Sequence, residues 1–215
     1  MKKIAVVFCV LLAFFTQMLE ANSKDKSMQK EVYIVHGFDA NPSKHWFSWL
    51  KDELEKEGAK VNVLTMPNPT DPKLSEWVKT LQKQIKVGEN TYIVGHSLGC
   101  ITILRYLDKL KKNQKIGGVV LVSGFYEKLS ILPQLDSFVN PTLDFEKVSK
   151  IAQERVVISS RDDMIVPTNL SSNLALKFKA TFIQTELGKH FMQDDGFTSF
   201  PLVLSVLNAM FVDKR

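Results

Sequence analysis

A serine between two glycines is the first pattern in this chain that could do chemistry. The stretch 95–99, Gly-His-Ser-Leu-Gly, follows a short run of β-branched and aromatic residues and precedes apolar residues at helical spacing. A strand that turns sharply into a helix crowds its own backbone, and glycine relieves the crowding because it has no Cβ. The turn would hold the Ser97 hydroxyl out of the sheet, above a helix N-terminus whose free N–H groups stabilise negative charge. We therefore predict that Ser97 is a nucleophile.

A serine hydroxyl is a poor nucleophile at neutral pH, so Ser97 needs a basic partner. The chain has four histidines, and in proteins with a nucleophile on this kind of turn the acid and then the histidine follow the serine. Only His190 follows Ser97, so we expect it to be the base; the alternative is a surface histidine. We expect His96 to pack or stabilise a loop, His36 to brace the loop that follows it, and His45 to be solvated at the start of a helix.

The histidine needs an acid, and the reaction needs donors for the developing negative oxygen. Asp162 and Asp163 both come directly after the fifth predicted strand, and either could orient an imidazole and stabilise its charged form. An oxyanion hole needs two backbone N–H groups. Leu98 follows the nucleophile directly and would supply one, and the loop after His36-Gly37 would supply the other at Phe38.

These residues must be brought together by elements that alternate along the chain. Helical patterns separate six short apolar runs that predict strands, at 31–35, 61–64, 92–95, 118–122, 156–160 and 181–185. This alternation favours right-handed crossovers and a parallel sheet that helices cover on both faces. We therefore predict an α/β fold, a three-layer αβα sandwich with a mostly parallel six-stranded sheet. The candidate residues all follow strands, so their loops meet at the carboxyl edge of the sheet, where ligands bind.

Four stretches of the chain jointly resemble the α/β-hydrolase superfamily, namely 36–38, 95–99, 162–167 and 188–191. More narrowly, they resemble small serine hydrolases related to retinoblastoma-binding protein 9 and to bacterial YdeN-type proteins. The segments 45–50 and 66–69, together with Trp77, also resemble the bacterial group, and the likeness covers residues 31–212. The resemblance implies a sheet of reduced α/β-hydrolase type in the order 2-1-3-4-5-6, without the first two strands of the full fold and without a large cap domain.

The resemblance also implies a catalytic triad of Ser97, Asp163 and His190. The sequence Asp-x-x-Val-Pro over 163–167 resembles the acid loop of the superfamily, which favours Asp163 and leaves Asp162 as a helper or a solvated turn residue. The expected activity is cleavage of small carboxylic esters through an acyl-enzyme, with no metal and no cofactor. Two alternatives are a peptidase or amidase with the same triad, and a binding protein on a hydrolase scaffold with little turnover.

Four aromatic residues near these motifs are candidates for an apolar acyl pocket. They are Trp46, Trp49, Phe125 and Phe191, with the hydrophobic core as the alternative and as the preferred interpretation for Trp49. The charge of the chain predicts no further ligand. Its net charge is +5 over 215 residues, and lysines and acids are mixed without the basic, aromatic-rich block of a nucleic-acid surface. The two cysteines, Cys9 and Cys100, form no Cys/His cluster that would predict zinc.

The first 23 residues differ in kind from the rest. Two lysines at positions 2 and 3 precede a charge-free apolar run at 4–15, which as a helix would measure roughly 18 Å and is too short to span a bilayer comfortably. We predict a signal peptide at 1–23, a linker at 24–30 and a hydrolase domain at 31–215, so the protein would be exported, periplasmic or secreted, without a membrane span after processing. The alternative is an uncleaved membrane anchor. Relatives of the resembled group are often intracellular, so this segment is the main departure from them.

Overall fold

A computed structural model describes residues 29–212, in which strands and helices alternate. The predicted signal peptide and most of the predicted linker lie outside the described residues. The strands are β1 (Glu31–Val35), β2 (Lys60–Leu64), β3 (Thr91–His96), β4 (Ile116–Val122), β5 (Ala152–Ser160) and β6 (Thr181–Thr185). The α-helices are α2 (Phe47–Lys56), α3 (Leu74–Gln84), α4 (Leu98–Lys109), α5 (Asp136–Val139), α6 (Phe145–Ile151), α7 (Thr168–Phe178) and α8 (Pro201–Phe211), and short 3-10 helices occupy Pro133–Leu135 and Gln193–Asp195.

The six strands form one sheet in the order β2-β1-β3-β4-β5-β6, and every neighbouring pair is parallel. The predicted αβα class and strand order are therefore confirmed. Because the strands are parallel, their carboxyl ends lie at one edge. The register places Val35 beside Gly95 in the centre and Ser160 beside Thr185 at the β6 end.

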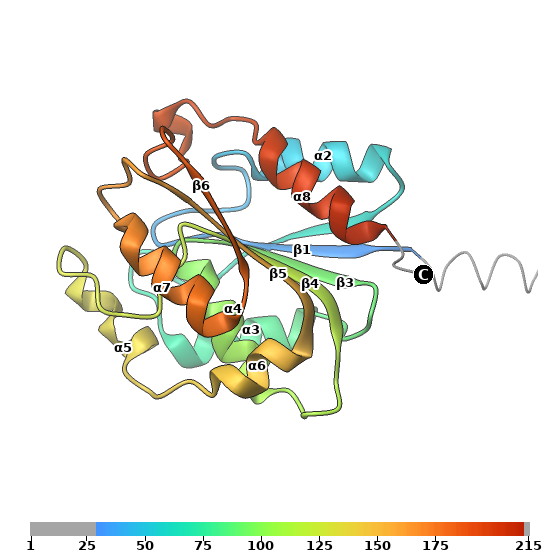
Figure 1. The fold of residues 1–215 in the computed structure, drawn as a ribbon, viewed down its shortest axis with the longest axis horizontal. Helices are drawn as coiled ribbons and strands as arrows, with labels where there is room; N and C mark the ends of the chain where they lie inside the picture. The colour runs from blue at the N-terminus through green and yellow to red at the C-terminus, as the bar shows by residue number, and fades with distance from the viewer. Residues whose placement is uncertain (1–28, 213–215) are drawn as a thin grey trace, which may run out of the picture.

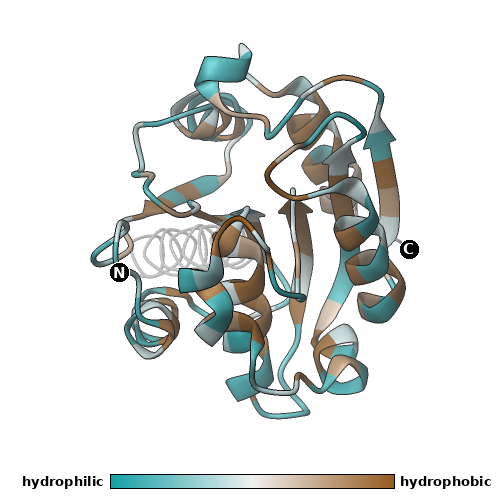
Figure 2. Cartoon of the chain, turned by 90° about the vertical axis from the view of Figure 1, so that its left-hand side faces the viewer, coloured by the Kyte–Doolittle hydropathy of each residue, from teal (hydrophilic) through white to brown (hydrophobic). Residues whose placement is uncertain are grey.

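Helices cover both faces of the sheet (Figure 1). Successive side chains of a strand point to opposite faces, so Val32 and Ile34 join a core with α2 and α8, while Tyr33 and Val35 join a core with α3, α4, α6 and α7. Figure 2 shows the result, with hydrophobic strands in the middle and hydrophilic residues on the outer faces of the helices. Within residues 29–212, no helix is long and apolar enough to cross a membrane.

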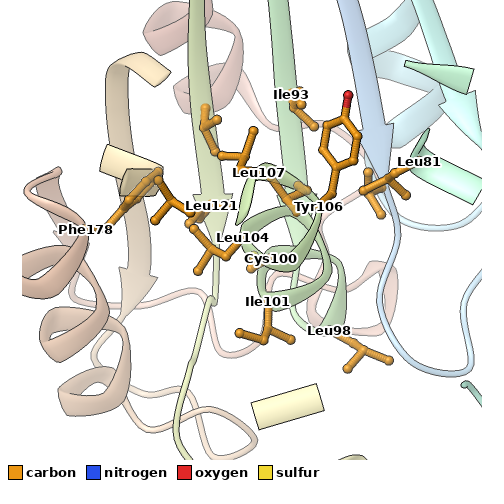
Figure 3. Packing of buried hydrophobic residues seen from close by; sticks show 14 of the residues in the cluster. Leu81, Ile93, Leu98, Cys100, Ile101, Leu104, Tyr106, Leu107, Leu121 and Phe178 are labelled. Carbon is orange, nitrogen blue, oxygen red and sulfur yellow. The ribbon is translucent and has the colours of Figure 1, made fainter. Parts of the chain in front are cut away.

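Helix α4 is the most deeply buried helix and fixes the position of the turn that precedes it. All ten residues from Leu98 to Leu107 are buried. Figure 3 shows its apolar side chains packed toward Leu81 of α3, Ile93 of β3 and Phe178 of α7. A helix enclosed on every side has little freedom to shift, because protein interiors are close-packed. The N-terminus of α4 therefore provides a rigid base for Ser97.

Candidate active site

Ser97 lies between β3 and α4 in a conformation that few side chains adopt. Its backbone angles are φ 52° and ψ −118°, and its N–H donates to the carbonyl oxygen of Val122 at 2.9 Å. A non-glycine residue at positive φ is strained and persists only where the surroundings hold it. Here β4 and the buried α4 supply that constraint. The residue is only 6% exposed, at the carboxyl edge where the sequence predicted it.

The two glycines that flank the turn have no room for a side chain. A Cβ on Gly95 would lie 2.6 Å from the Cδ1 atom of Ile103 and 3.0 Å from the Cα atom of Cys100. A Cβ on Gly99 would overlap the carbonyl oxygen of Val35 and lie 2.8 Å from that of His36. The strand and the helix therefore approach each other, and the end of β1, at distances that only glycine permits.

His190 and Asp163 form a buried pair at the same edge. The Nδ1 atom of His190 donates to the Oδ2 atom of Asp163 at 2.9 Å, and both side chains are 5% exposed or less. The Oδ1 atom of Asp163 accepts the backbone N–H groups of Ile165 and Val166, both at 2.9 Å. Because Nδ1 carries the proton in this pair, the Nε2 atom of His190 is left with a lone pair that can accept a proton.

A fourth donor to Asp163 comes from a residue that the sequence analysis did not single out. The hydroxyl of Ser123 donates to the Oδ2 atom of Asp163 at 2.8 Å. Ser123 is fully buried directly after β4, and its φ of 49° is strained like that of Ser97. The only sequence signal was a small polar residue at the end of an apolar strand and before a glycine, which is common in turns.

Asp162 holds the histidine loop from outside and does not contact the His190 side chain. Its Oδ1 atom accepts the hydroxyl of Ser160 and, at 2.8 Å, the backbone N–H of Lys189. These two bonds lower the pKa of the Asp162 carboxyl, with the Ser160 bond as the larger cause. The structure therefore separates the two aspartates, with Asp163 against the imidazole and Asp162 on the backbone beside it.

Further contacts fix the loop that carries His190. The Nε2 atom of His96 lies 2.8 Å from the carbonyl oxygen of His190, and the Nε1 atom of Trp46 donates to that of Phe191 at 3.1 Å. His45 and Gln193 exchange two bonds, because the backbone N–H of each donates to the other's side chain at 3.1 Å. We call these contacts the clamp on the His190 loop. The prediction of a solvated His45 was wrong, since the residue is half-buried and is part of this clamp.

Burial disfavours the charged form of two histidines that contact this loop, His96 and His45. Burial, together with the neighbouring His190, lowers the pKa of His96 well below its usual value, and burial lowers the pKa of His45 to about 4. A neutral His96 that donates from Nε2 has a lone pair on Nδ1, and Nδ1 has no partner among the described residues. His36 accepts the N–H of Met66 and contacts the carbonyl oxygen of Gly37 at 2.8 Å, so it braces the loop as predicted.

The backbone N–H groups of Phe38 and Leu98 are both available near Ser97. A Cβ added to Gly37 would lie 3.1 Å from the Cβ atom of Ser97, so the loop of Phe38 passes directly beside the turn. Leu98 is the first residue of α4. Within residues 29–212, neither N–H donates to a protein acceptor. These two N–H groups, in the segments next to Ser97, stay the candidates for the oxyanion hole that the sequence predicted.

The four aromatic residues considered for an acyl pocket lie elsewhere. Trp46 and Phe191 are completely buried in the core beneath α2 and α8, Phe125 is buried in the other core, and Trp49 packs against the first. Of the two alternatives that the sequence left open, the structure favours the core for Trp46, Phe125 and Phe191. The space beside His190 is instead a pocket of about 210 Å³ with Met164, Ile165 and Met192 in its walls. In the described part of the chain, no three metal-ligating side chains gather into a cluster.

Comparison with known proteins identifies close relatives. A family model described as serine hydrolase matches residues 32–209. The hydrolase YdeN of Bacillus subtilis (strain 168) is 45% identical over 185 residues, which cover 86% of this chain and 97% of YdeN. The crystal structure of that gene product has a TM-score of 0.84 with this chain at 44% identity, covering 86% of this chain and all of YdeN.

More distant proteins have lower sequence identity to this chain. The serine hydrolase RBBP9 of Rattus norvegicus is 23% identical over 164 residues, which cover 75% of this chain and 86% of RBBP9. Est1E from Butyrivibrio proteoclasticus has a TM-score of 0.67 at 13% identity, with 86% and 89% of the two chains covered, and this likeness extends to the fold alone. The family model spans most of this chain, and this chain matches YdeN over nearly the whole length of YdeN. The chain therefore belongs to the serine hydrolase family.

Proposed function

We propose that this protein is a carboxylesterase that cleaves small esters with a triad of Ser97, Asp163 and His190. The observation that carries the proposal is the buried His190–Asp163 pair at the edge of the sheet where the strained Ser97 turn lies. The carboxylate accepts hydrogen bonds from four donors, which fix its orientation. It thereby holds His190 in the tautomer whose Nε2 atom can act as a base.

In the first half of the reaction, the Oγ atom of Ser97 bonds to the ester carbonyl carbon while its proton passes to Nε2 of His190. The carbonyl oxygen becomes an oxyanion, which the N–H groups of Phe38 and Leu98 stabilise. The bond from the carbon to the alcohol oxygen then breaks, and Nε2 gives its proton to that oxygen. The alcohol departs and an acyl group remains on Ser97.

In the second half, a water molecule attacks the acyl carbon and passes its proton to Nε2 of His190. The tetrahedral intermediate uses the same two N–H groups and collapses with cleavage of the bond to Ser97. The Oγ atom recovers a proton from Nε2, and the carboxylic acid leaves. His190 therefore alternates between base and acid, while Asp163 keeps its orientation and stabilises the imidazolium.

Small esters suit the site better than peptides do. An ester needs little more than the nucleophile, the base and the two N–H donors, because an alcohol is a better leaving group than an amine. This argument supports an esterase over a peptidase or amidase with the same triad.

The test is covalent labelling with a fluorophosphonate probe together with hydrolysis of short chromogenic esters. We expect the wild type to label and to cleave, and Ser97→Ala to do neither. Ser48→Ala, on the exposed side of α2, is the matched control and should behave like the wild type. Absence of both labelling and ester cleavage in the folded wild type would overturn the proposal, and faster cleavage of matched anilides than of esters would reassign the activity to an amidase.

A further inference from the structure

The pocket beside His190 has a composition of its own. Two methionines and one isoleucine form the apolar part of its wall, and the other lining residues are charged or polar. The pocket is lined by Asp162, Met164, Ile165, Lys189, His190, Met192 and Asp195. Met164 is 83% exposed, an unusual position for a large apolar side chain. It follows Asp163 directly, so it stands next to the triad without taking part in the core.

The chemistry of His190 determines which part of a substrate this pocket can receive. Its Nδ1 atom is occupied by Asp163, so Nε2 is the nitrogen that delivers a proton to the departing alcohol. The alcohol oxygen must therefore come within hydrogen-bond distance of Nε2, about 2.6 to 3.2 Å. The carbon chain attached to that oxygen begins at the imidazole. His190 lines the pocket and Ser97 does not, so the pocket is placed to receive the alcohol side of a substrate and not the acyl group.

The walls indicate the class of alcohol. Methionine side chains are unbranched and polarisable, adapt to different shapes and make favourable contacts with aromatic rings. An apolar cavity of about 150 Å³ binds benzene, so a pocket of about 210 Å³ has room for a benzyl group. Two carboxylates and one ammonium line the rim, with Lys189 3.7 Å from Asp195, so the pocket carries no excess positive charge to attract an anion.

We propose that this pocket is the leaving-group subsite, and that Met164 and Met192 select neutral esters of aromatic alcohols about the size of benzyl alcohol. The inference rests on the proposed esterase function and adds to it the part of the substrate that the methionines recognise. It makes Met164 a determinant of specificity that touches the substrate.

The experiment compares acetate esters that share one acyl group and differ in the alcohol. Rates for benzyl acetate and ethyl acetate are followed by acid release and divided by their rates with hydroxide, which removes differences in intrinsic reactivity. We expect the wild type to favour benzyl acetate in kcat/KM by at least about tenfold, within the range that apolar pockets achieve. Met164→Ala and Met192→Ala should each reduce this preference by about fivefold, and Met164→Leu should largely retain it.

The control variant is Leu176→Ala, which removes another exposed apolar side chain, on α7 outside the pocket, and should leave the preference unchanged. A second control is the ratio of benzyl butyrate to benzyl acetate, which should stay the same in Met164→Ala because the pocket does not hold the acyl group. A changed acyl ratio with an unchanged alcohol preference would overturn the inference. The inference would also be overturned if an acetate ester whose benzyl group carries a carboxylate were cleaved faster than benzyl acetate.

These outcomes are distinguishable from failure of the proposed function. If Ser97 reacts with the fluorophosphonate probe and esters are cleaved, but the methionine variants keep the wild-type alcohol preference, the esterase proposal stands and the subsite is refuted. Met164 is exposed, so its truncation leaves the core intact. Circular dichroism of each variant checks that the fold is unchanged.

Discussion

Replacing Asp163 by asparagine should abolish catalysis through the tautomer of His190 while leaving the fold nearly intact. The carboxylate of Asp163 faces four donors, two at each oxygen. An asparagine has one oxygen and one NH₂ group, so its NH₂ group must face one of the two pairs. The backbone N–H groups of Ile165 and Val166 cannot turn away, and leaving both unsatisfied would cost about 2–6 kcal/mol.

The other orientation costs less, and it is the one that stops the reaction. With the NH₂ group toward His190, the Ser123 hydroxyl can rotate to another acceptor. The imidazole can move its proton from Nδ1 to Nε2 and accept at Nδ1. Nε2 then has no lone pair for the proton of Ser97. A histidine held in the wrong tautomer costs about 10⁴-fold in kcat, or about 5.5 kcal/mol of transition-state stabilisation.

The assay is kcat/KM for a short chromogenic ester, with ¹⁵N NMR of the imidazole to identify the protonated nitrogen. Asp162→Asn is the matched control. Its amide oxygen can keep the bonds from Ser160 and Lys189 while its NH₂ group faces solvent, so the rate should fall by less than about threefold. Equal losses in the two variants, or a loss of less than tenfold in a folded Asp163→Asn, would refute the reasoning.

Three further predictions concern the turn, the buried pair and the neutral histidine. Gly99→Ala should lower the free energy of unfolding by at least about 2 kcal/mol, because its Cβ would overlap a carbonyl oxygen of β1. Gly88→Ala is the control and should change the free energy of unfolding little, because the nearest atom to its Cβ would be 3.8 Å away. Urea unfolding of the two variants measures the difference. Ser123→Ala removes a bond to the Asp163 carboxylate and should reduce kcat/KM about tenfold; an unchanged rate would contradict its role. The pKa of His96 is lowered in the folded chain, so below about pH 6.5 the unfolded chain binds a proton that the folded chain does not. The free energy of unfolding therefore falls as the pH drops below that value, by up to about 1.4 kcal/mol per pH unit from this residue. Unfolding of His96→Gln between pH 7 and 5 should show a shallower decline than the wild type, and equal slopes would argue against it.

The fold could be predicted because it depends on local periodicity. Each apolar run of five or so residues between helical patterns became a strand, and Thr181–Thr185 was predicted with its observed bounds. β5 begins four residues earlier than predicted, at Ala152, because the polar sequence Gln153-Glu154-Arg155 hides its first half. Sequence patterns reveal which residues alternate, and they reveal less about where pairing with a neighbour extends a strand into polar residues.

The surroundings of the site could not be predicted in the same way, because they depend on contacts between distant segments. The spacing around Ser97 has a local mechanical cause. The sequence left Trp46 between an acyl pocket and the core, and the structure places it in the core, bonded to the loop of His190. Ser123 was overlooked because its importance comes from Asp163, 40 residues away. The resemblance of residues 163–167 to an acid loop favoured Asp163 over Asp162, and the geometry adds the contacts, with Asp163 on the imidazole of His190 and Asp162 on the backbone N–H of Lys189.

The clamp on the His190 loop links catalysis to the order of folding. Its contacts join residues 94, 145 and 148 positions apart, from His96 to His190, from Trp46 to Phe191 and between His45 and Gln193. Contacts of such separation are entropically costly and close late. A nascent molecule can therefore form the β3–α4 turn and expose Ser97 while its base is still absent. In the mechanism that we propose, Ser97 therefore lacks its base until the C-terminal segment docks on the N-terminal half.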